Sequence, residues 1–283
     1  MKVFIDGAIV DGKDARISVM DHGLLYGDGV FEGIRAWGGK VFRLDDHLSR
    51  LSYGSRALHM ELPYSKAELA DIVQRTVDAF GEDEAYIRLL VTRGVGPLGI
   101  DTHSCEAPNV VCMVDGLKIF PKEKQLSGVS LHTSGSRRAN FDAIDSRIKS
   151  LNYLTNVMAR VQARRSGADE ALLLNQAGHV AEASVANVFV VQDGVLITPP
   201  TTDGSLDGIT RRTVLELAES MGIPTQVRSI TRTDFFIGQD AFLSGTGAGI
   251  VRVSSLDGQA IGGREPSSIM VSILDGYVER RSS

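Results

Sequence analysis

The chain is organised around Ser146-Arg147-Ile148-Lys149-Ser150-Leu151-Asn152-Tyr153-Leu154, near its middle. A lysine stands here before a polar turn, and the spacing of the apolar residues that follow predicts a helix whose core face holds Leu151, Leu154, Met158 and Val161. A lysine amine reacts with a carbonyl group when it is partly desolvated and its tip is held in place. The apolar neighbours Ile148 and Leu151 permit both conditions. We therefore predict that Lys149 binds a carbonyl cofactor.

Composition predicts an ordinary soluble globular protein of the cytoplasm. The 283 residues are 43% hydrophobic, which is enough for two domains or one large one. The net charge is −5 and the basic residues are scattered, so we expect no nucleic-acid partner. No apolar run approaches the ~18 residues of a membrane span, and the first apolar residues are too few for a signal peptide. Cys105 and Cys112 lack a C-x-x-C spacing, so neither a disulfide framework nor a metal site is predicted.

The pattern of elements predicts a mixed α/β fold of two domains. Asp6-Gly7 suits a hairpin turn between two short strands, and the capping box from Ser65 to Glu68 begins a helix that ends at Gly81. Turn residues and a charge run make 117–127 the best linker. We therefore place a smaller N-terminal α/β domain at 1–116 and a larger C-terminal domain at 128–283, which carries Lys149.

Two loops can each bind a phosphate or carboxylate. Gly245-Thr246-Gly247-Ala248-Gly249 offers successive backbone amides of small residues, and Asp207-Gly208-Ile209-Thr210 precedes a predicted helix whose first amides have no backbone partner. With Arg50 as an available cation, these loops favour one monophosphate group. Gly94-Val95-Gly96-Pro97-Leu98-Gly99 matches a dinucleotide fingerprint literally, but no helix begins inside it, so we do not interpret it as one.

Glu182 is the candidate partner of a cofactor ring. It lies in Val180-Ala181-Glu182-Ala183-Ser184, among small residues that offer little competing polarity. A carboxylate in such a place could hold the N–H of a pyridinium ring and make the ring an electron sink. An isolated acid in a loop is more often simply solvated, so this interpretation depends on the other motifs.

Several segments in the same order resemble one known family. They are Asp21 through Arg35, Ala85-Tyr86-Ile87-Arg88, Lys149 through Leu154, Glu182 through Phe189, Gly208-Ile209-Thr210-Arg211 and Ser244-Gly245-Thr246. Over nearly its whole length the chain resembles the fold-type IV pyridoxal-phosphate enzymes, and most closely the branched-chain aminotransferases. The resemblance implies a two-domain fold similar to that of D-amino-acid aminotransferase, pyridoxal 5'-phosphate as cofactor and a homodimer or higher homo-oligomer.

Carried over residue by residue, the resemblance implies a cofactor site. Lys149 would form the Schiff base and move the proton at the substrate Cα. Glu182 would pair with the pyridine nitrogen, and Tyr153 would bond to the ring hydroxyl. The residues implied to bind the phosphate are Arg50, Ile209, Thr210 and Thr246.

The resemblance also implies a substrate site. Tyr86, with the amides of Thr246 and Gly247, would receive the α-carboxylate, and Arg88 would receive the second carboxylate of glutamate. The remaining substrate-binding residues are Tyr26, Phe31 and Arg35, with Tyr153 also beside the side-chain pocket. Tyr26 and the Gly94 to Asp101 loop would reach across the homodimer interface.

The leading function is transfer of the amino group of L-leucine, L-isoleucine or L-valine to 2-oxoglutarate. Alternatives on the same fold are a D-amino-acid or (R)-amine transaminase, an aminodeoxychorismate lyase and a non-catalytic cofactor-binding protein. Thr92-Arg93-Gly94 is not followed by the arginine and histidine typical of the D-amino-acid enzymes. The sequence departs from the family pattern at Ser146, where proline is usual, at Gly247 and Gly249, and at Arg252, which is expected to add charge near the carboxylate-binding turn.

Overall fold

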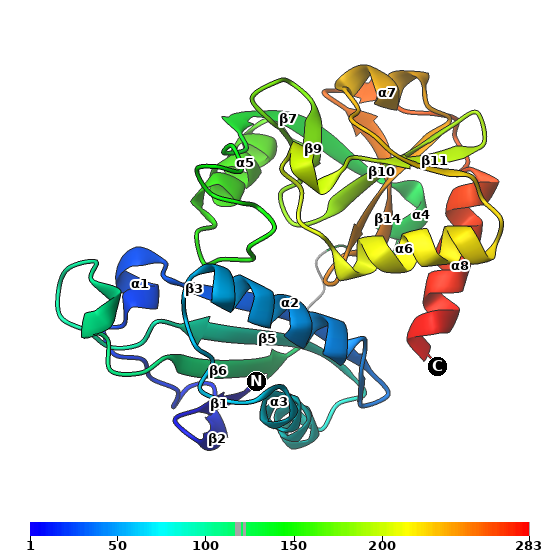
Figure 1. Cartoon of the computed structure of the whole chain (residues 1–283). Coiled ribbons are helices and arrows are strands. Elements are labelled where there is room, and N and C mark those ends of the chain that lie inside the picture. Colours follow the sequence, from blue (N-terminus) through cyan, green and yellow to red (C-terminus); the bar gives the residue numbers. More distant parts are fainter. Residues whose placement is uncertain (117–119, 121–122, 283) are drawn as a thin grey trace. The chain divides into compact units, whose positions relative to one another are not determined.

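Each of the two units in the computed structural model has its own β-sheet (Figure 1). Unit 1 comprises Met1–Leu117 and Ile148–Asn152, and unit 2 comprises Lys118–Arg147 and Tyr153–Ser283. The structure describes residues 1–116, 120 and 123–282, so part of the predicted 117–127 linker lies outside the described residues. The predicted mixed α/β class is confirmed, whereas the exact domain boundaries stay a prediction.

Unit 1 is an antiparallel sheet covered by helices. Its strand order is β2-β1-β6-β5-β3-β4. The strands are β1 (Lys2–Ile5), β2 (Ala8–Asp11), β3 (Gly29–Trp37), β4 (Lys40–Val41), β5 (Glu84–Thr92) and β6 (Asn109–Asp115). The helices are α1 (His22–Tyr26), α2 (Leu44–Ala57), α3 (Lys66–Phe80) and the short 3-10 turn η1 (Thr102–Ser104).

Side chains of β3 and β5 point alternately to the two faces of the sheet, and only one of these faces packs in the core of unit 1. Val30, Ile34 and Ala36 of β3 pack with apolar residues of α2 and α3 in one buried cluster. Successive side chains of a strand point to opposite faces, so the intervening residues of β3, beginning with Phe31 and Gly33, lie on the other face. β3 and β5 are paired along their whole length, which brings the matching residues of β5 to that same face.

Helix α3 begins and ends where the sequence predicts. The Ser65 hydroxyl accepts from the Glu68 amide at 3.3 Å, and the Glu68 carboxylate accepts from the Ser65 amide at 2.7 Å. Gly81 follows the last turn in the left-handed conformation, with φ of 75°. Side chains on one face of the helix, among them Leu69 and Val73, are buried in the unit 1 core. The predicted capping box is therefore confirmed.

Unit 2 is a mixed sheet with helices beside it. The strand order is β12-β11-β10-β13-β14-β7-β8-β9, with β15 paired to β14. The strands are β7 (Val129–Arg137), β8 (Glu170–Leu174), β9 (Val180–Ala183), β10 (Asn187–Gln192), β11 (Val195–Thr198), β12 (Thr225–Val227), β13 (Asp240–Gly245), β14 (Gly249–Leu256) and β15 (Gln259–Ala260). The helices are α4 (Lys124–Ser127), α5 (Leu154–Arg165), η2 (Thr201–Asp203), α6 (Ile209–Ser220), α7 (Arg232–Ile237) and α8 (Ser268–Ser282). Over the described residues, no helix combines the length and apolar character that a membrane span requires.

The predicted core face of the helix after Lys149 is wrong. Leu154, Val157, Met158 and Val161 of α5 are between 36% and 73% exposed. The buried apolar residues are instead Ala159 and Ala163, which pack on Ala171 and Leu173 of β8. Both faces of α5 have helical spacing, and the smaller side chains let the helix approach β8 closely. Spacing therefore predicted the helix but not which face is buried.

Candidate active site

Lys149 is held by backbone hydrogen bonds to the first residues of β3. The Phe31 amide donates to the Lys149 carbonyl at 2.9 Å, and the Leu151 amide donates to the Gly29 carbonyl at 2.9 Å. One edge of β3 is paired with β5. Along the other edge, the start of β3 pairs with the segment around Ser150 and the end of β3 pairs with β4. These bonds group Lys149 with unit 1, in contrast to the expectation that the C-terminal domain carries it. Lys149 precedes α5, as the sequence predicts.

Four of the predicted site residues gather on the outer face of β3 and β5. The Lys149 ammonium and the Arg88 guanidinium each lie 4.5 Å from the centroid of the Phe31 ring. Arg88 also donates to the Tyr86 hydroxyl at 3.1 Å. A Cβ atom at Gly33 would lie 2.3 Å from that hydroxyl, so the glycine makes room for Tyr86. Cations over an aromatic face are attracted by its quadrupole, which favours this arrangement.

Arg50 lies on the opposite, buried face of the sheet, where it pairs with Glu32. Arg50 Nε donates to Glu32 Oε1 at 2.8 Å, and Arg50 Nη2 donates to Oε2 at 2.7 Å. His47 Nδ1 donates to the same Oε2 at 2.7 Å. Burial alone would raise the pKa of Glu32, but the charge and hydrogen bonds of Arg50 and His47 outweigh it and lower the pKa to about 2. Burial also lowers the pKa of His47, against the hydrogen bond to Glu32 that would raise it.

Tyr26 and Arg35 make contacts within unit 1, and their substrate-binding roles stay predictions. The Tyr26 hydroxyl accepts from the Gly99 amide at 2.9 Å, and its ring meets His22 edge-on. Arg35 donates to Glu84 at 3.3 Å and lies over the Trp37 ring. Tyr26 thus fastens the Gly94 to Asp101 loop within unit 1.

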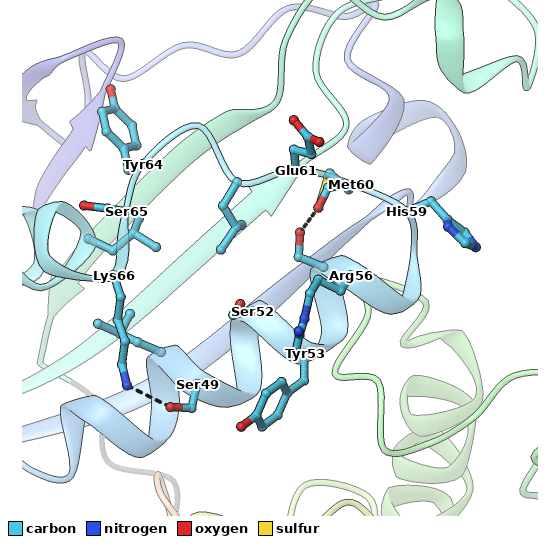
Figure 2. A pocket seen from close by; sticks show the side chains of 14 residues that line it. Ser49, Ser52, Tyr53, Arg56, His59, Met60, Glu61, Tyr64, Ser65 and Lys66 are labelled. Atoms are coloured by element: carbon cyan, nitrogen blue, oxygen red, sulfur yellow. Dashed lines mark hydrogen bonds between the residues drawn. The ribbon is translucent and has the colours of Figure 1, made fainter.

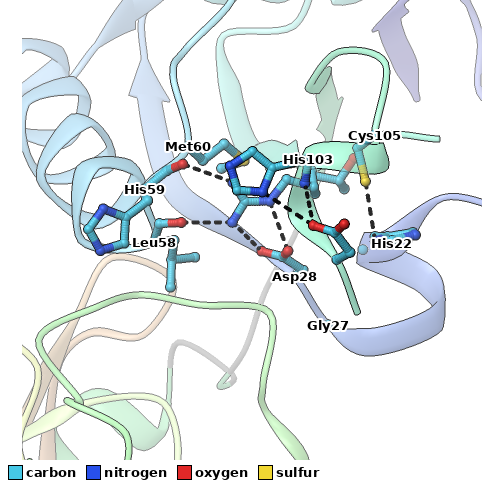
Figure 3. A network of polar contacts seen from close by, with 12 residues as sticks. His22, Gly27, Asp28, Leu58, His59, Met60, His103 and Cys105 are labelled. Atoms are coloured by element: carbon cyan, nitrogen blue, oxygen red, sulfur yellow. Dashed lines mark hydrogen bonds and ion pairs between the residues drawn. The ribbon is translucent and has the colours of Figure 1, made fainter. Parts of the chain in front are cut away.

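Ionisable residues anchor the segment between β2 and β3. Arg93 donates to both oxygens of Asp28, at 2.8 and 3.1 Å, and to the carbonyls of Leu58 and His59 (Figure 3). Cys105 Sγ lies 3.3 Å from His22 Nδ1, a contact that Figure 3 also marks. These contacts hold Asp28 and His22 in place within unit 1.

Unit 1 also has a cleft that none of the predicted site residues lines. It has a volume of about 760 Å³ and opens between α2 and the segment that leads into α3 (Figure 2). Its described lining includes Ser52, Tyr53, Arg56 and Lys66, but none of the predicted site residues.

In unit 2, Glu182 is a buried carboxylate on β9 with three donors around it. Arg138 donates to Oε1, while Oε2 accepts from Asn187 Nδ2 at 3.2 Å and from the Leu206 amide at 3.1 Å. Glu182 is 6% exposed. It is thus not the solvated loop acid that an isolated glutamate would be. Tyr153 lies at the N-cap of α5 in the same unit.

The predicted anion loops of unit 2 present unused donors. Gly208 is the N-cap of α6, and within the described part of the chain no side chain caps the amides that begin with Ile209 and Thr210. Thr246 lies in the tight turn between β13 and β14, where Gly245 pairs with Gly249. The buried Ser244 hydroxyl, one residue before that pair, has no hydrogen-bond partner among the described residues. Uncapped amides and an orphaned hydroxyl fit the phosphate of the implied cofactor.

Arg252 does not add charge to this turn as expected. Its Nε donates to Asp240 at 3.0 Å, and its other nitrogens donate to the carbonyls of Gly263, Arg264 and Glu265. Both members of the ion pair are buried. Arg252 therefore ties β14 to the segment before α8, and its role is structural.

Sequence reasoning missed the buried ion pair of Glu32 and the partners of Glu182. Arg138 lies in a polar stretch with no recognisable spacing, and Asn187 appeared only as part of a matching segment. Glu32 and His47 likewise belong to stretches whose periodicity marks them as ordinary strand and helix residues. A charged residue inside the apolar face of β3 is the signal that could have identified Glu32.

Comparison with known proteins places these residues in a family. The profile described as amino-transferase class IV matches residues 29–256. A putative branched-chain-amino-acid aminotransferase of Methanocaldococcus jannaschii is 41% identical over 100% of this chain and 97% of its own length. The D-alanine aminotransferase of Bacillus licheniformis is 32% identical over 96% of this chain and 94% of its own length.

A solved structure agrees with the sequence matches. The branched-chain amino acid aminotransferase from Thermobaculum terrenum, solved in its PLP form, superposes with a TM-score of 0.89, at 29% identity, over 98% of this chain and 92% of that one. The family match covers most of the chain, and the structural likeness covers both units. The chain therefore belongs to the class IV aminotransferase family.

Proposed function

We propose that the protein is a pyridoxal-phosphate-dependent transaminase that exchanges an amino group between a branched-chain L-amino acid and 2-oxoglutarate. The observation that carries the proposal is the cluster of Lys149, Phe31, Tyr86 and Arg88 on one face of unit 1. The names of the Methanocaldococcus and Thermobaculum relatives support the substrate class, and the PLP form of the latter supports the cofactor.

Three residues of the chain would have separate roles at the cofactor. When bound, pyridoxal 5'-phosphate supplies a carbonyl carbon that takes the amino group and a ring that acts as an electron sink. The Lys149 amine would move the proton between the substrate Cα and the carbonyl carbon of the cofactor. Glu182 would accept a hydrogen bond from the ring nitrogen, and the Tyr153 hydroxyl would bond to the ring oxygen.

The phosphate would be held by backbone amides and side-chain donors. The uncapped amides of Ile209 and Thr210 at the start of α6 provide a partial positive charge, and Thr246 would add a further donor. Arg50 remains a candidate, but two of its nitrogens already donate to Glu32. We therefore expect the α6 amides to contribute more to phosphate affinity than Arg50.

The substrate would be read by the unit 1 cluster. The Phe31 ring offers an apolar surface for an aliphatic side chain, while the Tyr86 hydroxyl can donate to the α-carboxylate. Arg88 would receive the second carboxylate of glutamate or 2-oxoglutarate by a charge-assisted hydrogen bond. Arg88→Met is therefore expected to impair 2-oxoglutarate as acceptor far more than L-leucine as donor.

The cofactor and substrate assignments are tested separately. The purified protein, loaded with pyridoxal phosphate, should show a visible absorption band that Lys149→Ala abolishes. A colourless wild type that retains no cofactor would refute the proposal. A half-reaction panel of L-leucine, L-valine, D-alanine, (R)-1-phenylethylamine and aminodeoxychorismate then measures preference. Faster conversion of D-alanine than of L-leucine would assign the protein to the activity of its Bacillus relative instead.

We also propose that two copies of the chain associate through α5. The exposed side chains of Leu154, Val157, Met158 and Val161 form an apolar stripe on this helix, and a second copy would remove it from water. Sedimentation velocity should give a dimer or larger assembly for the wild type and a smaller species for Val157→Glu/Met158→Glu. The exposed Arg164→Glu on the same helix is the matched control. A monomeric wild type would exclude this contact.

A further inference from the structure

The Glu182 carboxylate is fixed by residues from separate elements of unit 2. Its Oε1 is taken by Arg138, which follows β7, and its Oε2 by Asn187 at the start of β10 and by the amide of Leu206. A buried carboxylate that accepts several directed bonds has one orientation, because rotation would leave its oxygens and their donors unsatisfied. The direction in which Glu182 presents its remaining acceptor capacity is therefore determined by these neighbours.

Arg138 is itself held at both ends. Its amide donates to the Leu174 carbonyl at 2.9 Å, and its Nη1 donates to Asn156 Oδ1 at 3.2 Å. Asn156 in turn donates to the Ser184 carbonyl at 2.6 Å. A Cβ atom at Gly204 would lie 3.2 Å from the Arg138 Cβ, so the arginine stem is closely packed as well. The guanidinium is thus placed by its surroundings rather than by Glu182 alone.

Asn187 links the carboxylate to the start of α6. Its Nδ2 donates to the Leu206 carbonyl at 2.8 Å as well as to Glu182. Its Oδ1 lies against Gly208, where a Cβ atom would come within 2.0 Å. Because Leu206 also donates its amide to Glu182, a closed ring of bonds joins the acid to the segment that ends at the α6 N-cap.

We propose that Arg138 and Asn187 are positioning residues that hold the Glu182 carboxylate in one orientation and tie it to the α6 N-terminus. The inference rests on the proposed function, in which Glu182 faces the ring nitrogen and α6 binds the phosphate. The two contacts belong to opposite ends of one rigid cofactor, so their separation must be constant. Arg138 compensates the charge of the Glu182 carboxylate, and Asn187 fixes the spacing between Glu182 and the start of α6.

Cofactor binding by the full chain tests the two roles. We compare wild type, Arg138→Met, Arg138→Lys and Asn187→Ala, with Arg137→Met as the control because Arg137 is exposed at the end of β7. Loss of a hydrogen bond to a charged group predicts that Arg138→Met weakens pyridoxal phosphate binding by about tenfold or more. Arg138→Lys should recover part of this loss, and Arg137→Met should match wild type.

Two further readouts separate positioning from general stability. The pH titration of the visible band should shift in Arg138→Met and return toward wild type in Arg138→Lys, because a charge beside Glu182 is restored. Asn187→Ala should reduce affinity for pyridoxal phosphate more than for pyridoxal, since the latter has no phosphate to keep in register. If Arg138→Met does not fold, Arg138→Lys and Asn187→Ala carry the same comparisons.

The outcomes are distinguishable from failure of the proposed function. A wild type that binds no pyridoxal phosphate refutes the function itself. A wild type that binds it, with wild-type affinity and an unshifted band titration in the Arg138 variants, refutes only the role of Arg138. Equal loss of affinity for pyridoxal and pyridoxal phosphate in Asn187→Ala refutes the spacing role of Asn187.

Discussion

Glu32 in unit 1 and Glu182 in unit 2 are both buried carboxylates bonded to an arginine, yet their surroundings differ. The partners of Glu32 are His47 and Arg50, which lie on the single helix α2. Glu182 draws its partners from the end of β7, the start of β10 and the segment before α6. Glu32 is 0% exposed, and Glu182 is 6% exposed.

From this difference we expect the Glu32–Arg50 pair to be structural and the Glu182–Arg138 pair to support cofactor binding. Around Glu32, one arginine occupies both oxygens and fastens α2 to β3 inside the apolar core. Around Glu182, donors of three kinds converge on a carboxylate that is itself a predicted cofactor contact. We therefore expect changes at Glu32 to reduce stability first and changes at Glu182 to reduce cofactor binding and activity first.

Glu32→Gln should have the largest effect on stability. Removing one partner of a buried ion pair leaves the other charge uncompensated, and this costs about 3–5 kcal/mol of unfolding free energy. Urea denaturation of the cofactor-free chain measures the loss. Glu84→Gln is the control, because Glu84 pairs with Arg35 at the surface and is 65% exposed. A loss no larger than that of the control would show that the Glu32 pair does not stabilise unit 1.

Glu182→Gln should show the opposite balance. We expect transamination to fall by about 10²–10³-fold, as when a single preorganised electrostatic partner is removed. The stability cost should be about 1–2 kcal/mol, because Arg138 keeps its bond to Asn156. Steady-state kinetics and denaturation of the same preparation provide both numbers. A stability loss equal to that of Glu32→Gln, with activity retained, would reverse the distinction between the two sites.

The ionisation of Glu32 should make the stability of the chain depend on pH at acidic pH. Its folded pKa, about 2, lies below the ordinary value of 4.5, so its contribution is complete above about pH 5 and is lost as the pH falls toward 2. The contribution is about 3 kcal/mol at neutral pH. Denaturation from pH 6 to pH 3 should therefore show a shrinking difference between wild type and Glu32→Gln. A difference that stays constant over this range would mean that Glu32 titrates normally.

His47 should make the smallest contribution. Burial lowers its pKa in the folded state, so the unfolded chain binds more protons as the pH falls below about 6.5, and stability declines there. His47→Gln keeps a donor near Glu32 but cannot be protonated, and it should flatten the stability curve between pH 7 and pH 5. An unchanged slope in that interval would contradict the lowered pKa.

Local chemistry made much of the fold predictable. The Ser65 capping box with Gly81 fixed the bounds of α3, since both signals act within a few residues. The Asp6-Gly7 turn likewise joins β1 to β2 as expected, with Ile5 paired to Ala8. For α5, both faces carry a helical repeat, and the choice between them depends on how closely β8 is approached.

Site residues that lie within the family motifs could be predicted from the sequence. Pairs of residues that are far apart in the chain could not. Lys149 and Arg88 were both predicted, and they share the Phe31 ring. Their roles stay predictions. Arg138 and Glu182 are separated by 44 positions, and no local pattern announces such a pair. Arg252 was misjudged for the same reason, because its partner Asp240 lies on the neighbouring strand β13.

The five residues Ile148–Asn152 also determine how the chain can be divided. They complete unit 1, although the rest of that unit ends near residue 117. A cut between Asp115 and Glu123 would thus produce two fragments, of which the first lacks the strand-like piece that borders β3 and the second carries it. The two fragments could reassociate through this pairing. In the first fragment alone, the Phe31 amide would lack the Lys149 carbonyl and the Gly29 carbonyl would lack the Leu151 amide. Cofactor loading would then report complementation.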